Sequence, residues 1–127
     1  LGVRMKISYL NLPWEDGERW GIRAGCRFPN LQKKNTNSYV PFPFLIAYAA
    51  SYAESQGADV LCIDGVAERC SVQSVKDRVS AHASDLIVVE TSTTSLGKDL
   101  FILDELKAEC PRAKIALYGS HVDVRPG

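Results

Sequence analysis

The chain has 127 residues, of which 46% are hydrophobic and 24% charged, and this composition is typical of one globular domain. Fifteen Lys and Arg residues balance fifteen Asp and Glu residues, so charge gives no general case for binding nucleic acid or an anionic membrane. No apolar run approaches the ~20 residues needed to cross a bilayer, so we expect no membrane span.

The four cysteines stand at positions 26, 62, 70 and 110, and their spacing matches no zinc, iron–sulfur or redox dithiol motif. Cys62 falls in an apolar stretch, which predicts a buried thiol that acts as a small hydrophobe. Reduced thiols and the absence of a signal-peptide pattern predict a cytoplasmic protein.

The N-terminal third of the chain contains one clear element. Residues 1–4 precede Met5 and are interpreted as an extension, and residues 5–10 have the content of a strand. Residues 11–40 then show no clean periodicity. A connection of this length is either a functional loop or a sign that the assignment of elements is incomplete.

The next segment predicts a helix followed by a strand. Residues 41–57 begin with helix-compatible prolines and end on Gly57, a favourable residue just beyond a helix. The interior is apolar nearly all round, which predicts a helix buried against a sheet rather than a surface helix. Residues 59–64 predict the second strand.

A second helix is predicted over residues 71–83, with Ser71 as its N-cap. Its apolar stripe consists of Val72, Val75 and Val79. His82 extends this stripe near the helix C-terminus, where we expect a structural role.

The remaining elements complete an alternating pattern. Residues 85–90 form an uninterrupted apolar run, the pattern of a strand covered on both faces. A third helix over residues 95–109 stops before Pro111, and residues 113–119 predict the fourth strand.

This alternation of strands and helices predicts an α/β fold, a Rossmann-like or flavodoxin-like three-layer sandwich with a parallel sheet of order 2-1-3-4. The topological switch point then lies between the first and third strands, and the loops that leave them line its crevice. Flavodoxin-like domains continue to a fifth strand. We therefore expect residues 1–127 to be one domain, truncated before that strand and belonging to a longer enzyme.

The residues that three common kinds of site require are missing from this crevice. A dinucleotide site needs a glycine-rich turn after the first strand, but residues 11–17 read NLPWEDG, and Asp64 at the end of the second strand does not replace it. A phospho-receiver needs acids after the first and third strands, and only the third ends in one, Glu90. The sequence has no G-x-S-x-G motif; His121 is left as either a ligand contact or a loop residue.

Five consecutive hydroxyl side chains follow the third strand. They are Thr91, Ser92, Thr93, Thr94 and Ser95. One helix start uses one or two of them as caps, and Ser95 or Thr94 are best placed. The others predict a pocket for a ligand with many neutral hydrogen-bonding groups, because a hydroxyl both donates and accepts.

Several stretches together resemble one protein family. They are MKISYLNLPW (5–14), RWGIRAGCRFP (19–29), VPFPFLIAYAASYAESQGADVLCIDG (40–65), DLIVVETSTTS (85–95) and AKIALYGSHV (113–122). Over residues 5–127 the chain resembles the N-terminal cobalamin (B12)-binding domain of B12-dependent radical S-adenosylmethionine enzymes. The resemblance implies a Rossmann-like domain with the corrin over the carboxyl edge of the sheet and the nucleotide tail inserted beside it.

The resemblance also implies cofactor-binding residues. The tail pocket would be lined by Thr91, Ser92, Thr93 and Thr94. It would be flanked by Gly119, Ser120 and His121. The mouth near the metal face would consist of Asn11, Leu12, Pro13 and Trp14. Arg23, Arg27 and Tyr39 are further candidates, with solvation or ion pairing as the open alternative, and Trp14 and Trp20 could equally cap the core.

In this family a C-x-x-x-C-x-x-C motif in a downstream barrel of the same polypeptide holds a [4Fe–4S] cluster and S-adenosylmethionine, and that motif is absent here. The resemblance therefore implies a chain that binds cobalamin but has no catalytic residue of its own, within a parent Fe–S oxidoreductase or methyltransferase. The D-x-H-x-x-G motif is also absent, so no axial histidine is expected from that loop. The alternative is a cofactor-free α/β interaction or pseudo-receiver module.

Overall fold

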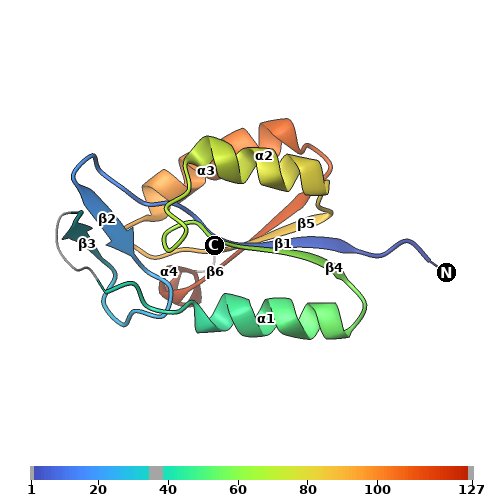
Figure 1. Ribbon diagram of the computed structural model, residues 1–127, viewed down its shortest axis with the longest axis horizontal. Coiled ribbons are helices and arrows are strands. Elements are labelled where there is room, and N and C mark those ends of the chain that lie inside the picture. Colours follow the sequence, from blue (N-terminus) through green and yellow to red (C-terminus); the bar gives the residue numbers. More distant parts are fainter. Residues whose placement is uncertain (1, 35–38, 126–127) are drawn as a thin grey trace.

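The computed structural model describes residues 2–34 and 39–125. In this part of the chain, four parallel strands form the central sheet: β1 (Lys6–Asn11), β4 (Asp59–Asp64), β5 (Leu86–Glu90) and β6 (Lys114–Tyr118). Their spatial order is β4-β1-β5-β6, the second, first, third and fourth of these strands along the chain (Figure 1). The labels differ from 2-1-3-4 because an intervening hairpin is numbered too. The predicted α/β class is confirmed.

Helices lie on both faces of this sheet. One face carries α2 (Val72–His82) and α3 (Leu96–Glu109), and the opposite face carries α1 (Phe44–Ser55) (Figure 1). A short helix, α4 (Ser120–Val124), follows β6 directly. The arrangement is a three-layer sandwich, as the alternating pattern predicted.

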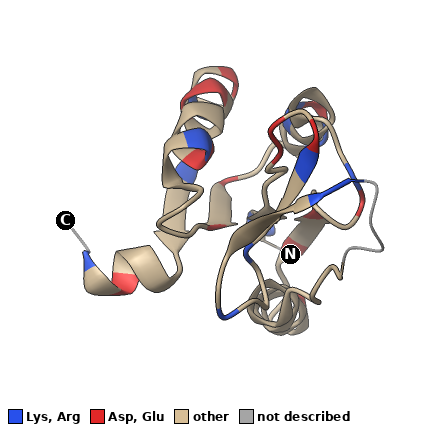
Figure 2. Cartoon of the chain, turned by 90° about the vertical axis from the view of Figure 1, so that its left-hand side faces the viewer, with Lys and Arg blue, Asp and Glu red and all other residues tan. Residues whose placement is uncertain are grey.

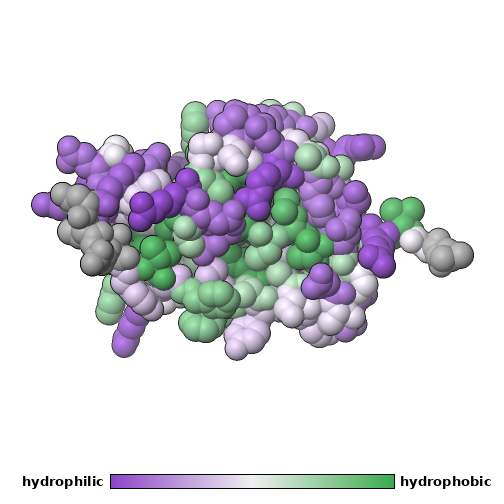
Figure 3. All heavy atoms as spheres, viewed as in Figure 1, coloured by the Kyte–Doolittle hydropathy of each residue, from purple (hydrophilic) through white to green (hydrophobic). Residues whose placement is uncertain are grey.

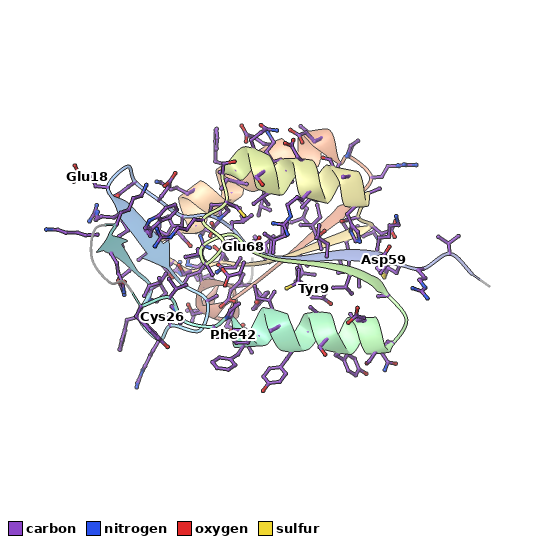
Figure 4. All side chains as sticks on the ribbon, viewed as in Figure 1. Tyr9, Glu18, Cys26, Phe42, Asp59 and Glu68 are labelled. Atoms are coloured by element: carbon purple, nitrogen blue, oxygen red, sulfur yellow. The ribbon has the colours of Figure 1, made fainter. Side chains whose placement is uncertain are left out.

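The apolar core is divided by the sheet into two clusters. The larger lies under α2 and α3 and includes the fully buried Leu10, Ile63 and Leu106. The smaller lies between the sheet and α1, where Tyr9 packs with Ile46. Figure 4 shows Tyr9 on the α1 side of the sheet. Each strand of the interior therefore places alternate side chains in different clusters, as the period of two requires.

The ends of α2 agree with the sequence. The Oγ of Ser71 accepts a hydrogen bond from the backbone N–H of Ser74 at 3.1 Å, which is the predicted N-cap. Nδ1 of His82 lies 3.0 Å from the Oγ of Ser84, and its Nε2 lies 3.2 Å from Oδ1 of Asp59. These contacts join the end of α2 to the start of β4, the structural role expected of this histidine.

The long segment after β1 contains a hairpin that the sequence did not reveal. Its strands are β2 (Arg19–Ile22) and β3 (Asn30–Lys33), which pair antiparallel. Both are four residues long and mix polar with apolar side chains, so their periodicity is weak. A Cβ on Gly21 would lie 2.1 Å from the ring of Trp14, so glycine is needed for the hairpin to close over that ring.

The prediction that α1 is buried on nearly all sides is wrong. Ile46 is 0% exposed and packs on the sheet, but Tyr48 is 72% exposed. Further exposed apolar side chains of this helix and its approach are Phe42, Phe44, Leu45 and Tyr52. Figure 2 shows α1 almost without charged residues, although one side faces solvent. Apolar composition indicated the helix but could not show that only the face of Ile46 and Ala50 packs on the sheet.

The predicted burial of Cys62 is also wrong. Its strand, β4, is the outer strand beside β1, and the side chain is exposed there. The four cysteines all lie within the described residues and all are free thiols. In the view of Figure 3, apolar residues form a band between the α2–α3 layer and α1. Over residues 2–34 and 39–125, no helix has the length and apolar character needed to traverse a bilayer.

Candidate functional site

A buried arginine organises the carboxyl edge of the sheet. Arg23 directly follows β2 and is 3% exposed. Its Nη1 donates to Oδ1 of Asn11 at 2.7 Å and to the carbonyl oxygen of Leu12 at 2.6 Å. Its Nε donates to the Oγ of Ser95 at 3.0 Å, and its Nη2 donates to Oδ1 of Asp99 at 2.8 Å. One guanidinium thereby joins the hairpin segment to the end of β1 and to the start of α3.

Asp99 is the charge partner of this arginine and is 0% exposed. Its Oδ2 accepts hydrogen bonds from the hydroxyls of Thr91 and Ser95, each at 2.7 Å. Burial lowers the pKa of the Arg23 guanidinium, and the negative charge of Asp99 opposes that shift. Two of the five consecutive hydroxyls are therefore hydrogen-bonded to a buried carboxylate rather than directed at a ligand.

The mouth predicted around Trp14 is closed. The guanidinium carbon of Arg23 lies 5.4 Å from the Trp14 ring centroid, and the indole is buried. Leu12 belongs to the core cluster under α2 and α3, and Asn11 donates to Oδ1 of Asp64 at 2.9 Å. These side chains build the floor of the carboxyl edge but present little surface to solvent.

A cavity of about 330 Å³ opens beside this floor. Four segments that are distant in the sequence form it: the loop after β2, the start of α1, the end of β5 with its loop, and the end of β6 with its loop. Its lining residues are Arg23, Cys26, Arg27, Pro29, Leu45, Glu90, Thr91, Ser92, Tyr118, Gly119, Ser120 and Asp123. Figure 4 shows Cys26 near the N-terminal end of α1, next to Phe42. The cavity lies at the carboxyl ends of β5 and β6, whereas the crevice was predicted between β1 and β5. There the buried Arg23 joins Asn11 at the end of β1 to Ser95 at the start of α3.

Glu90 and Tyr118 form the inner polar pair of the cavity. They occupy opposite positions on β5 and β6, and the phenol of Tyr118 donates to Oε2 of Glu90 at 2.9 Å. Burial raises the pKa of the Glu90 carboxyl, while the Tyr118 hydrogen bond and the charge of Arg23 act in the opposite direction. Burial and the nearby Glu90 charge also raise the pKa of Tyr118.

The loops after β5 and β6 hold the more accessible predicted residues. Thr93 is exposed, and its hydroxyl lies 3.0 Å from Nδ1 of His121. Gly119 has φ +130°, and a Cβ there would lie 2.1 Å from the carbonyl oxygen of Thr91. Glycine at this position therefore lets the loop after β6 approach the loop after β5, which sets the shape of the rim.

The predicted site residues divide into two groups. Buried in the floor or engaged in internal hydrogen bonds are Asn11, Leu12, Pro13, Trp14, Thr91 and Ser92. Partly or fully exposed are Thr93, Thr94, Gly119, Ser120 and His121, of which Gly119 and Ser120 line the cavity. Of the further candidates, Arg23 is ion-paired, Arg27 is exposed at the cavity edge, and Tyr39 is exposed.

Sequence reasoning missed Asp99 and Tyr118, and it considered Glu90 only as one of the two acids that a phospho-receiver needs. Asp99 stands one turn after Ser95 in an otherwise apolar helix stripe, and that spacing was a signal for an inward-facing carboxylate. No sequence pattern indicated Tyr118, because its pairing with Glu90 depends on the register of β5 and β6.

A second cavity, of about 350 Å³, lies on the other face of the sheet. Its lining is mostly apolar and comes from α2, α3 and the loop after β1, with Val72, Phe101 and Ile102 as examples. Pro13 is the predicted site residue that it contains. The carboxyl-edge cavity is the better candidate, because it is lined by predicted residues from two strand-end loops, Thr91 and Ser92 after β5 and Gly119 and Ser120 after β6.

No protein-family model, curated protein or solved structure matches this chain. Within the part of the chain that the structure describes, no three His, Cys, Asp or Glu side chains are grouped so that they could hold a metal ion. The features that bear on function are therefore the geometry of the carboxyl-edge cavity and the motifs that surround it.

Proposed function

We propose that this chain is the cobalamin-binding domain of a cytoplasmic B12-dependent radical S-adenosylmethionine enzyme. In this proposal the chain holds the cofactor and is not catalytic alone. The [4Fe–4S] cluster and S-adenosylmethionine belong to a downstream barrel of the same polypeptide, which acts as its partner. The observation that carries the proposal is the cavity at the carboxyl edge, formed jointly by the hairpin segment, the hydroxyl-rich loop and the loop of Gly119.

The accessible residues suit part of a large and mostly neutral ligand. Ser120 lines the cavity, and Thr93, Thr94 and His121 are accessible side chains of the neighbouring loops. Their hydroxyl and imidazole groups can donate or accept without a charge partner. When bound, cobalamin would supply a cobalt centre for methyl transfer or rearrangement. The residues of this chain would bind and orient it.

The sheet also offers an apolar wall next to the cavity. On the α1 side, Leu86 and Val88 of β5 are partly buried and Ala116 of β6 is exposed. They lie on the same face as Glu90 and Tyr118, so this wall continues from the cavity toward the amino edge of the sheet. A cofactor larger than the cavity itself could pack along it.

Cobalamin retention tests this proposal. The protein is incubated with hydroxocobalamin and desalted, and its visible spectrum should then show corrin bands. Ser120→Trp, which places an indole at the cavity, should weaken retention about tenfold or more, equivalent to roughly 1.4 kcal/mol. Gln73→Trp, an exposed position on α2 away from this cavity, should retain cobalamin like the unaltered protein.

A colourless protein after desalting, with native circular dichroism, would refute the cobalamin proposal. Equal retention by the Ser120→Trp variant would instead move the binding site away from the cavity. Thr91→Leu is unsuitable as a blocking variant, because the Thr91 hydroxyl is bonded to the buried Asp99 and its loss would disturb the fold.

The exposed side of α1 favours a second function, a cofactor-free interaction module. Large apolar patches on a protein surface mark interaction sites, and Leu45, Tyr48 and Tyr52 form such a stripe at helical spacing. The same desalting experiment distinguishes the two functions, since an interaction module without a cofactor gives no corrin bands.

A further inference from the structure

The inner wall of the carboxyl-edge cavity carries a carboxyl group with one open oxygen. Glu90 is 8% exposed, and its Oε2 accepts the hydrogen bond from the Tyr118 phenol. Its Oε1 has no hydrogen-bond partner among the described residues, and it is not one of the fully enclosed unpartnered atoms there. A ligand in the cavity can therefore reach this oxygen.

The other buried polar groups around the cavity are engaged inside the protein. The hydroxyl of Thr91 donates to Asp99, and the hydroxyl of Ser92 lies 2.8 Å from that of Ser95. Glu90 consequently provides the buried, charged acceptor that a ligand would meet. A buried acceptor of this kind favours a ligand that brings a donor, because an unpaired charge away from water is costly.

The charges near Glu90 also favour donors over anions. The guanidinium of Arg23 is neutralised by Asp99 at 2.8 Å, and Asp64 adds further negative charge. At the rim, Arg27 and Asp123 are both exposed and of opposite sign. The inner cavity is therefore net negative, so a carboxylate ligand would be repelled at the position where an N–H group would be bound.

We propose that Glu90 selects ligand groups that carry N–H donors, namely primary amides or protonated amines, and that Tyr118 positions its carboxylate. The inference concerns the cavity of the proposed function and deepens it, since the corrin ring carries primary amide side chains. Tyr118 acts through Glu90 and is a positioning residue. It fixes one carboxylate oxygen and so directs the other into the cavity.

Benzamide and benzoate are suitable probes, because they have nearly the same shape and differ in the presence of an N–H donor and in charge. Their binding is measured at pH 8 by NMR, through the backbone amides of Ser92 and Gly119, which line the cavity. We expect the unaltered protein to bind benzamide more tightly than benzoate, on the order of tenfold. Glu90→Gln should abolish this preference, and Tyr118→Phe should reduce it.

The matched control is Glu68→Gln. Glu68 follows β4 at the same edge of the sheet but bonds to Arg78 outside the cavity, so this variant should keep the preference (Figure 4). A merely structural role for Glu90 would change the affinity of both probes and leave their ratio unaltered. Equal binding of the two probes, no binding of benzamide, or a preference that survives Glu90→Gln would overturn the proposal.

The two proposals fail separately. A protein that is colourless after desalting but prefers benzamide through Glu90 would refute cobalamin binding and support the selection of N–H donors. Retention of cobalamin together with equal binding of benzamide and benzoate would refute the selection and leave the cobalamin proposal standing.

Discussion

At the scale of single residues, the pair formed by Arg23 and Asp99 dominates the carboxyl edge. Burying two charges is costly, and it is tolerated where each charge has a partner and the remaining polar atoms are hydrogen-bonded. Here Thr91 and Ser95 supply hydroxyls to the carboxylate, and Asn11 accepts from the guanidinium. The hydroxyl cluster is thus explained in part by the requirements of an internal ion pair.

Removing the arginine tests this account. Arg23→Met should lower the free energy of unfolding by about 3–5 kcal/mol, because it leaves Asp99 buried without its counter-charge. Adding Asp99→Asn to the same chain should recover a large part of the loss, since the amide oxygen can still accept from the hydroxyls. Urea denaturation measures both changes.

Arg19→Met provides the control for that experiment. Arg19 pairs with Asp16 on the surface, and exposed ion pairs contribute at most about 1 kcal/mol. A loss after Arg23→Met that is no larger than the loss after Arg19→Met would show that the buried network contributes little to stability.

At the scale of secondary-structure elements, α1 has two different faces. Ile46 and Ala50 pack on the sheet, while the side chains on the opposite flank face solvent. The helix contains one charged residue, Glu54, which is exposed, and the exposed stripe of Leu45, Tyr48 and Tyr52 carries no charge (Figure 2). Such a flank can be covered by a partner without burying a charge.

Substitutions on the two faces of α1 should differ sharply. Ile46→Ala should cost about 2–5 kcal/mol of unfolding free energy, because it creates a cavity in the core. Tyr48→Ala on the exposed flank should change stability by no more than about 0.5 kcal/mol. Urea denaturation compares the two, and an equal cost for Tyr48→Ala would mean that the tyrosine is covered in solution, for example by a second copy.

At the scale of the whole molecule, protection differs across the sheet. β1 pairs with strands on both sides, whereas β6 pairs with β5 on one side. Beside β6, the α1 face is also open at Ala116. Stability is therefore expected to fall from β1 toward β6.

Native-state hydrogen exchange measures this gradient. The backbone amides of β1 should exchange at the rate set by global unfolding, and those of β6 should exchange faster. Binding of cobalamin along the wall should slow exchange in β6 more than in β4, which lies at the opposite edge. Uniform protection of β1 and β6 in the free protein would contradict the expectation.

Much of the fold could be predicted because its signals are local. The Ser71 cap, the stop before Pro111 and the apolar run of β5 each involve neighbouring residues. The hairpin was not predicted because its short strands have no clear periodicity. It packs closely on Trp14, a contact that no local sequence pattern indicates. Trp14 itself was predicted either at a ligand mouth or as a cap on the core, and the fold buries it.

The location and the composition of the candidate site were each predictable only in part. Parallel strands with crossover helices bring their carboxyl ends together, so periodicity indicated the loops after β1 and β5, and the family resemblance added the loop after β6. The cavity lies at the ends of β5 and β6. The pairing of Arg23 with Asp99 joins residues 76 positions apart, and the pairing of Glu90 with Tyr118 depends on strand register. Such contacts leave no local pattern, because they arise only when the chain is packed. The hydroxyls after β5 could be recognised as unusual from the chain alone. Which of them support an ion pair and which stay exposed to solvent was decided by the packing of the chain.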